Sequence, residues 1–128
     1  MDENEIGKIT VDRAVAIHRD LGPGLLESVY EAALQRTLSE QGLRVERQVP
    51  IAFEYAGRRF EEGFRADLVL DGKVIVEVKS VETLKAVHKK QILTYLRLSK
   101  MRLGFILNFG AALMRDGIVR IVNGLPDA

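Results

Sequence analysis

The stretch "VIVEVKS" at residues 74–80 has the composition of a β-strand, yet it carries a carboxylate and an amine two residues apart. Successive side chains of a strand point to opposite faces, so Glu77 and Lys79 share one face with Ile75. An edge strand with a solvated polar face is one interpretation, and two charges that converge on a ligand is the other. The opposite face is apolar throughout: Val74, Val76 and Val78.

The preceding segment adds a second carboxylate. Asp71-Gly72 predicts a two-residue hairpin that joins "ADLVL" (66–70) to this strand. Counting back from the turn places Asp67 near Val76, and a slip of one residue or a bulge places it directly beside Glu77 on the same face. A solvated or capping role is the alternative for an Asp at the start of a strand. The nearby Glu77 and Lys79 favour a shared site.

This arrangement has the chemistry of a magnesium site. Mg²⁺ takes oxygen ligands at about 2.1 Å and keeps several waters. Asp67, Glu77 and a backbone carbonyl such as that of Val78 would make half an octahedron and leave positions for water and phosphate. Lys79 can orient or help deprotonate the metal-bound water and offset charge on the reacting phosphate. Without a metal, the two carboxylates repel and one pKa rises.

Two helices are predicted before the strands, over residues 6–20 and 25–41, separated by the break "LGPG". Glu27 lies near the start of the second helix, on the margin of its apolar stripe. A glutamate there is commonly favoured by the helix dipole alone. The functional alternative is a further carboxylate for the metal, supplied directly or through water.

A third helix is predicted over residues 84–99, where His88, Gln91 and Tyr95 follow one another at one-turn spacing. Polar groups on a core-facing stripe are costly, so we expect this face to border a cleft. A half-buried Tyr95 in the core and a surface Gln91 are the alternative.

Charge is distributed unevenly. The whole chain has 19 basic and 18 acidic residues, a net charge of +1. Residues 84–102 nevertheless contain six basic and no acidic residues, which predicts one basic helix that attracts phosphates. A solvated basic face is the alternative. The six residues are Lys85, Lys89, Lys90, Arg97, Lys100 and Arg102.

Length and composition bound the remaining possibilities. The 128 residues, 47% hydrophobic and 29% charged, predict one folded soluble domain over residues 1–128. The chain has no cysteine, which excludes disulfides and thiolate metal sites and fits a reducing cytoplasm. Its two histidines argue against a His-rich zinc site. The opening "MDENEIGK" and the lack of a long apolar run predict neither signal peptide nor membrane partner.

The predicted element order is α-α-β-β-β-β-α-β-β, with a last hairpin turning at Asp116-Gly117. We expect a mixed α/β domain in which helices flank a curved sheet.

The spacing of these residues resembles known nuclease motifs. Asp67, nine intervening residues and then Glu77-x-Lys79 resemble the core of the PD-(D/E)XK nuclease superfamily, with Ala66 in place of the proline. Gln91 and Tyr95 resemble the Q-xxx-Y motif of its RecB-like branch. The stretch "GLLESVYE" matches the pattern of a small prokaryotic family named GxxExxY at three positions, Gly24, Glu27 and Tyr30.

The resemblance implies a restriction-endonuclease-like fold and a set of site residues. The implied catalytic residues are Glu27, Asp67, Glu77, Lys79, Gln91 and Tyr95. The implied metal-site acids are Glu27, Asp67 and Glu77, to which the coordination chemistry above adds the Val78 carbonyl. We expect nucleic-acid contacts from Lys85, His88, Lys89 and Lys90.

Together these features predict a Mg²⁺-dependent phosphodiesterase, with Mn²⁺ as substitute, in which a metal-activated water attacks the phosphodiester. DNA is favoured over RNA as substrate. One alternative is a non-catalytic nucleic-acid-binding or regulatory protein on a nuclease scaffold. Another is an enzyme that works through a partner protein, and a homodimer is compatible with either view.

Overall fold

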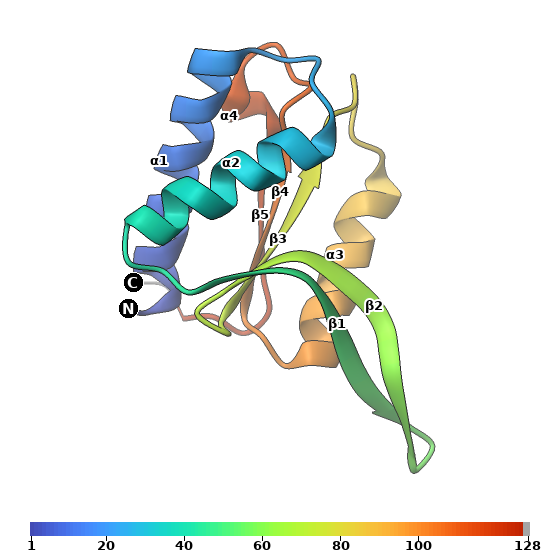
Figure 1. The fold of residues 1–128 in the computed structure, drawn as a ribbon. Helices are drawn as coiled ribbons and strands as arrows, with labels where there is room; N and C mark the ends of the chain where they lie inside the picture. Colours follow the sequence, from blue (N-terminus) through green and yellow to red (C-terminus); the bar gives the residue numbers. More distant parts are fainter. Residues whose placement is uncertain (127–128) are drawn as a thin grey trace.

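A five-stranded mixed sheet forms the centre of the protein in the computed structural model, which describes residues 1–126. The strands lie in the order β1-β2-β3-β4-β5 (Figure 1); only the β3–β4 pair is parallel. The strands are β1 (Val45–Tyr55), β2 (Arg58–Leu70), β3 (Val74–Lys79), β4 (Leu103–Asn108) and β5 (Ile118–Val122). The helices are α1 (Glu3–Leu21), α2 (Glu27–Glu40), α3 (Ala86–Ser99) and the single turn α4 (Met114–Gly117).

The helices form two layers around the sheet. Figure 1 shows α1 and α2 on one side and α3 on the other. The alternation within β3 explains this arrangement, because Val74, Val76 and Val78 pack into the α1–α2 core. Ile75 points the other way and packs with Ile92 of α3. The predicted mixed sheet flanked by helices is therefore confirmed, as are the two faces of the central strand.

The observed order, α-α-β-β-β-α-β-α-β, differs from the prediction in two places. Three strands precede α3 instead of four. The predicted hairpin at Asp116-Gly117 is wrong, because these residues end the helical turn α4. Gly117 packs so tightly on the Asn108 carbonyl oxygen that a Cβ would lie 2.2 Å from it. This close contact holds the segment against the end of β4.

The β2–β3 connection also differs from the predicted two-residue turn. Leu70 pairs with Val74, which leaves three connecting residues. Asp71 is held by the start of β1: its N–H donates to the Arg44 carbonyl (2.9 Å), and its Oδ1 accepts the Arg44 N–H (2.7 Å). These contacts extend the β1–β2 pairing into the turn. The β2–β3 register differs by one residue from the register of a two-residue turn. Asp67 therefore comes level with Glu77.

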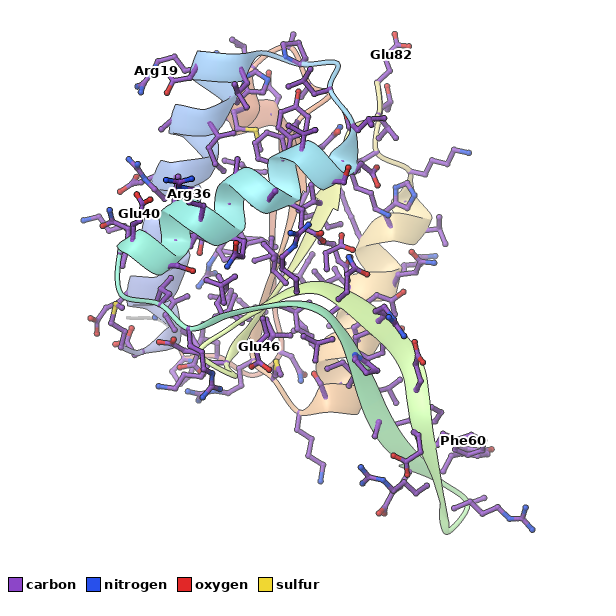
Figure 2. All side chains as sticks on the ribbon, viewed as in Figure 1. Arg19, Arg36, Glu40, Glu46, Phe60 and Glu82 are labelled. Atoms are coloured by element: carbon purple, nitrogen blue, oxygen red, sulfur yellow. The ribbon has the colours of Figure 1, made fainter. Side chains whose placement is uncertain are left out.

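Beyond this point β1 and β2 continue as a curved two-stranded arm that projects from the body of the protein (Figure 1). Figure 2 shows Phe60 near the far end of the arm. Its ring stacks on that of Phe53, with 5.0 Å between the centroids. Across residues 1–126, none of the helices has the length and apolarity needed to cross a bilayer.

Candidate active site

Glu77 lies in the middle of the sheet. It sits on the central strand β3, beside Ile106 of β4, and only 9% of its surface is exposed. The edge-strand interpretation is therefore wrong. A carboxylate at such a position needs a compensating partner, because burial of an ionised group is costly.

The Asp67 carboxylate fills the point where β2 and β3 separate. The backbone pairing between the two strands stops at Leu68 and Val76. Beyond this pair, Asp67 Oδ2 accepts the Val78 N–H at 2.8 Å. Asp67 Oδ1 accepts a hydrogen bond from Gln48 Nε2 at 3.2 Å. The side chain thus replaces a missing backbone acceptor and stays next to Glu77.

Glu77 is poorly satisfied in this environment. Burial, followed by the neighbouring Asp67 carboxylate, raises the pKa of Glu77 to about 9, and the charge of Lys79 only partly opposes this rise. Its Oε1 is buried without a hydrogen-bond partner anywhere in the described chain. Such an oxygen calls for a proton or a cation, because unpaired buried polar atoms are rare in folded proteins.

Helix α3 covers the face of the sheet that carries Glu77 and Lys79. Glu77 and Lys79 line a cavity of about 30 Å³ together with Ile106 and four residues of α3, and a space of this size can hold a water molecule. Those four are His88, Gln91, Ile92 and Tyr95. The structure thus brings five predicted site residues around one small polar cavity.

The α3 residues have distinct local contacts. The Tyr95 ring stacks on that of Phe64 of β2, with 3.9 Å between the ring centroids. Burial, followed by the nearby Glu77 and Asp67 carboxyl groups, raises the pKa of the Tyr95 hydroxyl. His88 Nδ1 accepts the Lys85 N–H at 3.2 Å, which leaves Nε2 as the protonated nitrogen of the neutral ring. Tyr95 is therefore fixed on the sheet, and His88 is fixed at the start of the helix.

Glu27 contacts the end of β3. Its Oε2 accepts the Ser80 N–H at 3.1 Å, and Ser80 Oγ donates to the Leu25 carbonyl at 2.8 Å. Tyr30 holds the same loop through its hydroxyl. The hydroxyl donates to the Gly22 carbonyl at 2.5 Å and accepts the Leu25 N–H at 3.1 Å. The "GLLESVY" stretch therefore shapes a loop that is fastened one residue beyond Lys79.

The three acidic residues are not gathered equally. Asp67 and Glu77 are adjacent, whereas Glu27 is engaged with the backbone of Ser80. Among residues 1–126, no group of three His, Cys, Asp or Glu side chains is close enough together to hold a metal ion. The arrangement is a carboxylate pair with a third carboxylate at the edge of the site.

Comparison with known proteins places the chain in a family. The family model of the PD-(D/E)XK nuclease superfamily matches residues 4–121. The chain belongs to this superfamily. The crystal structure of SSO0001 is similar to this fold, with a TM-score of 0.54 and 18% identity, over 94% of this chain and 67% of that chain. Among curated proteins, none matches the chain.

Superfamily membership indicates a nuclease, which acts on nucleic acid, and PD-(D/E)XK nucleases generally use divalent metal ions. The carboxylate pair fits such an ion in its chemistry. Hard cations such as Mg²⁺ and Mn²⁺ prefer oxygen ligands. The unpartnered Glu77 Oε1, buried beside Asp67, is an oxygen of this kind.

The basic residues are more dispersed than predicted. Lys89 and Lys90 are exposed on α3, and Lys85 caps its N-terminus. Arg102 lies beyond the helix and forms an ion pair with Glu3 of α1 at 2.9 Å. The prediction of one helix with six basic residues is therefore wrong, because α3 ends at Ser99. Lys89 and Lys90 lie on the first two turns of α3, and neither lines the cavity.

Glu31, Arg47 and Gln48 form a polar group next to Asp67 that was not predicted from the sequence. Glu31 is buried, and its Oε2 accepts the Arg47 guanidinium at 2.8 Å. Gln48 Nε2 donates to Glu31 Oε1 at 2.7 Å and to Asp67 Oδ1 at 3.2 Å. One signal was present in the sequence: Arg47 occupies a strand position where the alternation of Val45 and Val49 predicts an apolar side chain.

Proposed function

We propose that the protein is a Mg²⁺-dependent phosphodiesterase that hydrolyses DNA, with Mn²⁺ able to replace Mg²⁺. The observation that carries this proposal is the buried, unpartnered Oε1 of Glu77 beside Asp67 on the central strand. Lys79, two residues further on the same face, lines the same cavity as Glu77. Two adjacent carboxyl groups, one of them buried, with a cationic side chain next to them suit the binding of a metal and a phosphate.

In this proposal Asp67, Glu77 and the Val78 carbonyl hold the ion, with Glu27 reaching it through water. When bound, the ion supplies Lewis acidity and lowers the pKa of the attacking water. Lys79 orients that water and offsets the negative charge that builds on the phosphate.

Helix α3 supplies the remaining groups. Gln91 and Tyr95 face the reacting phosphate from the cavity wall. The start of α3 contacts the flanking backbone phosphates, because its basic side chains are exposed and available to them. The residues proposed for these contacts are Lys85, His88, Lys89 and Lys90.

Motif content supports a finer placement within the superfamily. Gly24, Glu27 and Tyr30 fit the GxxExxY pattern, and Gln91 with Tyr95 fits the Q-xxx-Y motif of the RecB-like branch. We assign the chain to both groups, as one nuclease domain over residues 1–128. A prokaryotic nuclease of this kind would meet its DNA in the cytoplasm, and a homodimer or a partner protein would help it to reach both strands.

A second candidate is a non-catalytic nucleic-acid-binding or regulatory protein on the same scaffold. The separation of Glu27 from the other two carboxylates favours it. Such a protein would keep the basic start of α3 and bind nucleic acid without cleaving it.

Incubation with labelled substrates distinguishes the two candidates. Purified protein is mixed with single-stranded, double-stranded and branched DNA, and with RNA, in Mg²⁺, Mn²⁺ or EDTA. We expect cleavage of DNA with either metal and none in EDTA, and we expect Glu77→Gln to abolish it. Mn²⁺ should also raise the melting temperature, because a ligand bound only by the folded state stabilises it. Binding without cleavage in every metal would favour the second candidate.

A further inference from the structure

The backbone of Gln48 is unusual for its position. Its φ of 51° lies in the left-handed region, which a residue with a Cβ rarely adopts. Within residues 1–126, three other non-glycine residues have positive φ, and these lie in tight turns or at a helix end: Ala56, Asp71 and Lys100. Gln48 alone of the four lies inside a strand. Such strain persists where the surrounding structure requires it.

The consequence is a change of face in both strands of the arm. Before Gln48, Val45 packs against the α1–α2 core; after it, Val49 packs against the α3 core. Strand β2 changes in the same place, since Leu68 belongs to the first core and Ala66 to the second. Asp67 lies at this crossing, opposite Gln48 in the register. The crossing places both side chains at the site where β2 leaves β3.

The side-chain amide of Gln48 is fixed by the buried Glu31. Glu31 is buried, with 8% of its side chain exposed, and its Oε2 is occupied by Arg47. Its Oε1 accepts Gln48 Nε2 at 2.7 Å. Because both neighbours of this nitrogen are carboxylates, only the NH₂ end of the amide can face them. The other proton of Nε2 is then available for Asp67 Oδ1 at 3.2 Å.

Asp67 is consequently held through both of its oxygens. Gln48 donates to Oδ1, and the Val78 N–H donates to Oδ2 at 2.8 Å. Two donors on different elements fix the rotation of the carboxylate, and each oxygen retains a free lone pair. We propose that Gln48 is a positioning residue: its amide, oriented by Glu31, holds the Asp67 carboxylate in one orientation beside Glu77. What Asp67 then binds rests on the proposed function.

Replacing Gln48 with Gly tests the inference, because Gly accepts the backbone angle but lacks the amide. Ala56→Gly is the matched control. It relieves the same left-handed backbone (φ 53°) at the tip of the arm, away from the site. We expect both variants to fold, with melting temperatures close to that of the wild type.

Two measurements are made on each variant: the Mn²⁺ affinity by calorimetry, and the Asp67 carboxyl ¹³C resonance in metal-free protein. Gln48→Gly should bind Mn²⁺ about 10–100-fold more weakly, the usual effect of removing a group that orients a ligand. It should also move the Asp67 resonance, whereas Ala56→Gly should change neither. A Gln48→Gly protein with wild-type affinity and an unmoved resonance would overturn the inference, even if its melting temperature fell.

The two proposals fail separately. If wild-type protein binds no Mn²⁺, the metal-dependent function is wrong and the ¹³C resonance alone decides the role of Gln48. A shifted Asp67 resonance would then support the positioning role, and an unchanged one would reject it. If the wild type binds Mn²⁺ and Gln48→Gly binds it equally well, the function stands and Gln48 has no part in it.

Discussion

Strand β3 presents two faces to the protein, and they differ in how well their side chains are satisfied. The face toward α1 and α2 consists of Val74, Val76 and Val78, all essentially without exposed surface. The face toward α3 begins with Ile75 but continues with Glu77, whose buried Oε1 has no partner in the described chain. The first face stabilises the sheet by removing apolar surface from water. The second keeps a buried carboxyl group whose pKa is raised and whose Oε1 lacks a hydrogen-bond partner, and such perturbed groups are typical of functional sites.

The largest expected effect is on catalysis and concerns the face toward α3. Lys79→Ala should slow single-turnover cleavage by about 10²–10⁴-fold, the usual contribution of one positioned acid, base or charge stabiliser. The melting temperature should change little, because Lys79 is partly exposed. Lys73→Ala, an exposed lysine before the same strand, is the control and should cleave normally. Wild-type cleavage by Lys79→Ala would refute the proposed role of this face.

Stability against pH provides the next test of the same face. The folded pKa of Glu77 is about 9, above its ordinary value of 4.5. Between these values the unfolded chain releases a proton that the folded metal-free protein retains. Its contribution to stability is therefore complete below about pH 4.5 and is lost as the pH rises toward 9, by up to about 1.4 kcal/mol per pH unit.

Urea unfolding at a series of pH values measures this slope. Glu77→Gln cannot titrate, so the slope between about pH 5 and 9 should become shallower by roughly one proton. An identical slope in the variant would assign the pH dependence to other groups and would place the Glu77 pKa near its ordinary value.

A substitution on the apolar face should lower stability and leave catalysis unchanged. Val76→Ala should lower the free energy of unfolding by about 2 kcal/mol, because it removes buried methyl groups and leaves a cavity. Cleavage per folded molecule and Mn²⁺ affinity should stay at wild-type levels. Urea unfolding measures the stability, and calorimetry measures the affinity. Loss of Mn²⁺ binding in a folded Val76→Ala protein would show that the two faces are not independent.

The smallest effect concerns the exposed start of α3. Changing Lys89 and Lys90 to Glu should weaken DNA binding and reduce the salt dependence of log K by about one for each phosphate that the variant no longer binds. Arg19→Glu with Arg36→Glu is the matched control, since these exposed cations lie on the α1–α2 side (Figure 2). Titrations at several salt concentrations measure the slope. Equal reductions in the two double variants would mean that net charge, and not this surface, governs binding.

Local sequence patterns were sufficient to predict the strand and the helix that carry the candidate site. The alternation of "VIVEVKS" predicts a strand with one apolar and one charged face, and the one-turn spacing of His88, Gln91 and Tyr95 predicts a shared helix face. Both patterns depend on the fixed periods of strand and helix, so they can be read without knowing the neighbours. The count of four strands before the third helix was wrong. The last hairpin failed because the packing of Gly117 against Asn108 is a tertiary contact.

The relative placement of the acidic residues depended on tertiary contacts. Arg44, just before β1, binds Asp71 in the β2–β3 turn, and the observed register brings Asp67 level with Glu77. Ser80 engages Glu27, a contact between residues 53 positions apart. No sequence period encodes either contact.

The sequence by itself determined which residues are candidates for the site: the E-x-K strand, Asp67 and the polar face of the third helix follow from spacing and side-chain chemistry. Only the tertiary structure decided how they are satisfied. It gave β3 the central position that buries Glu77, and it oriented Asp67 through Gln48 and Val78. The physical reason is that burial and hydrogen-bond satisfaction are properties of the assembled surroundings, whereas periodicity is a property of the local chain.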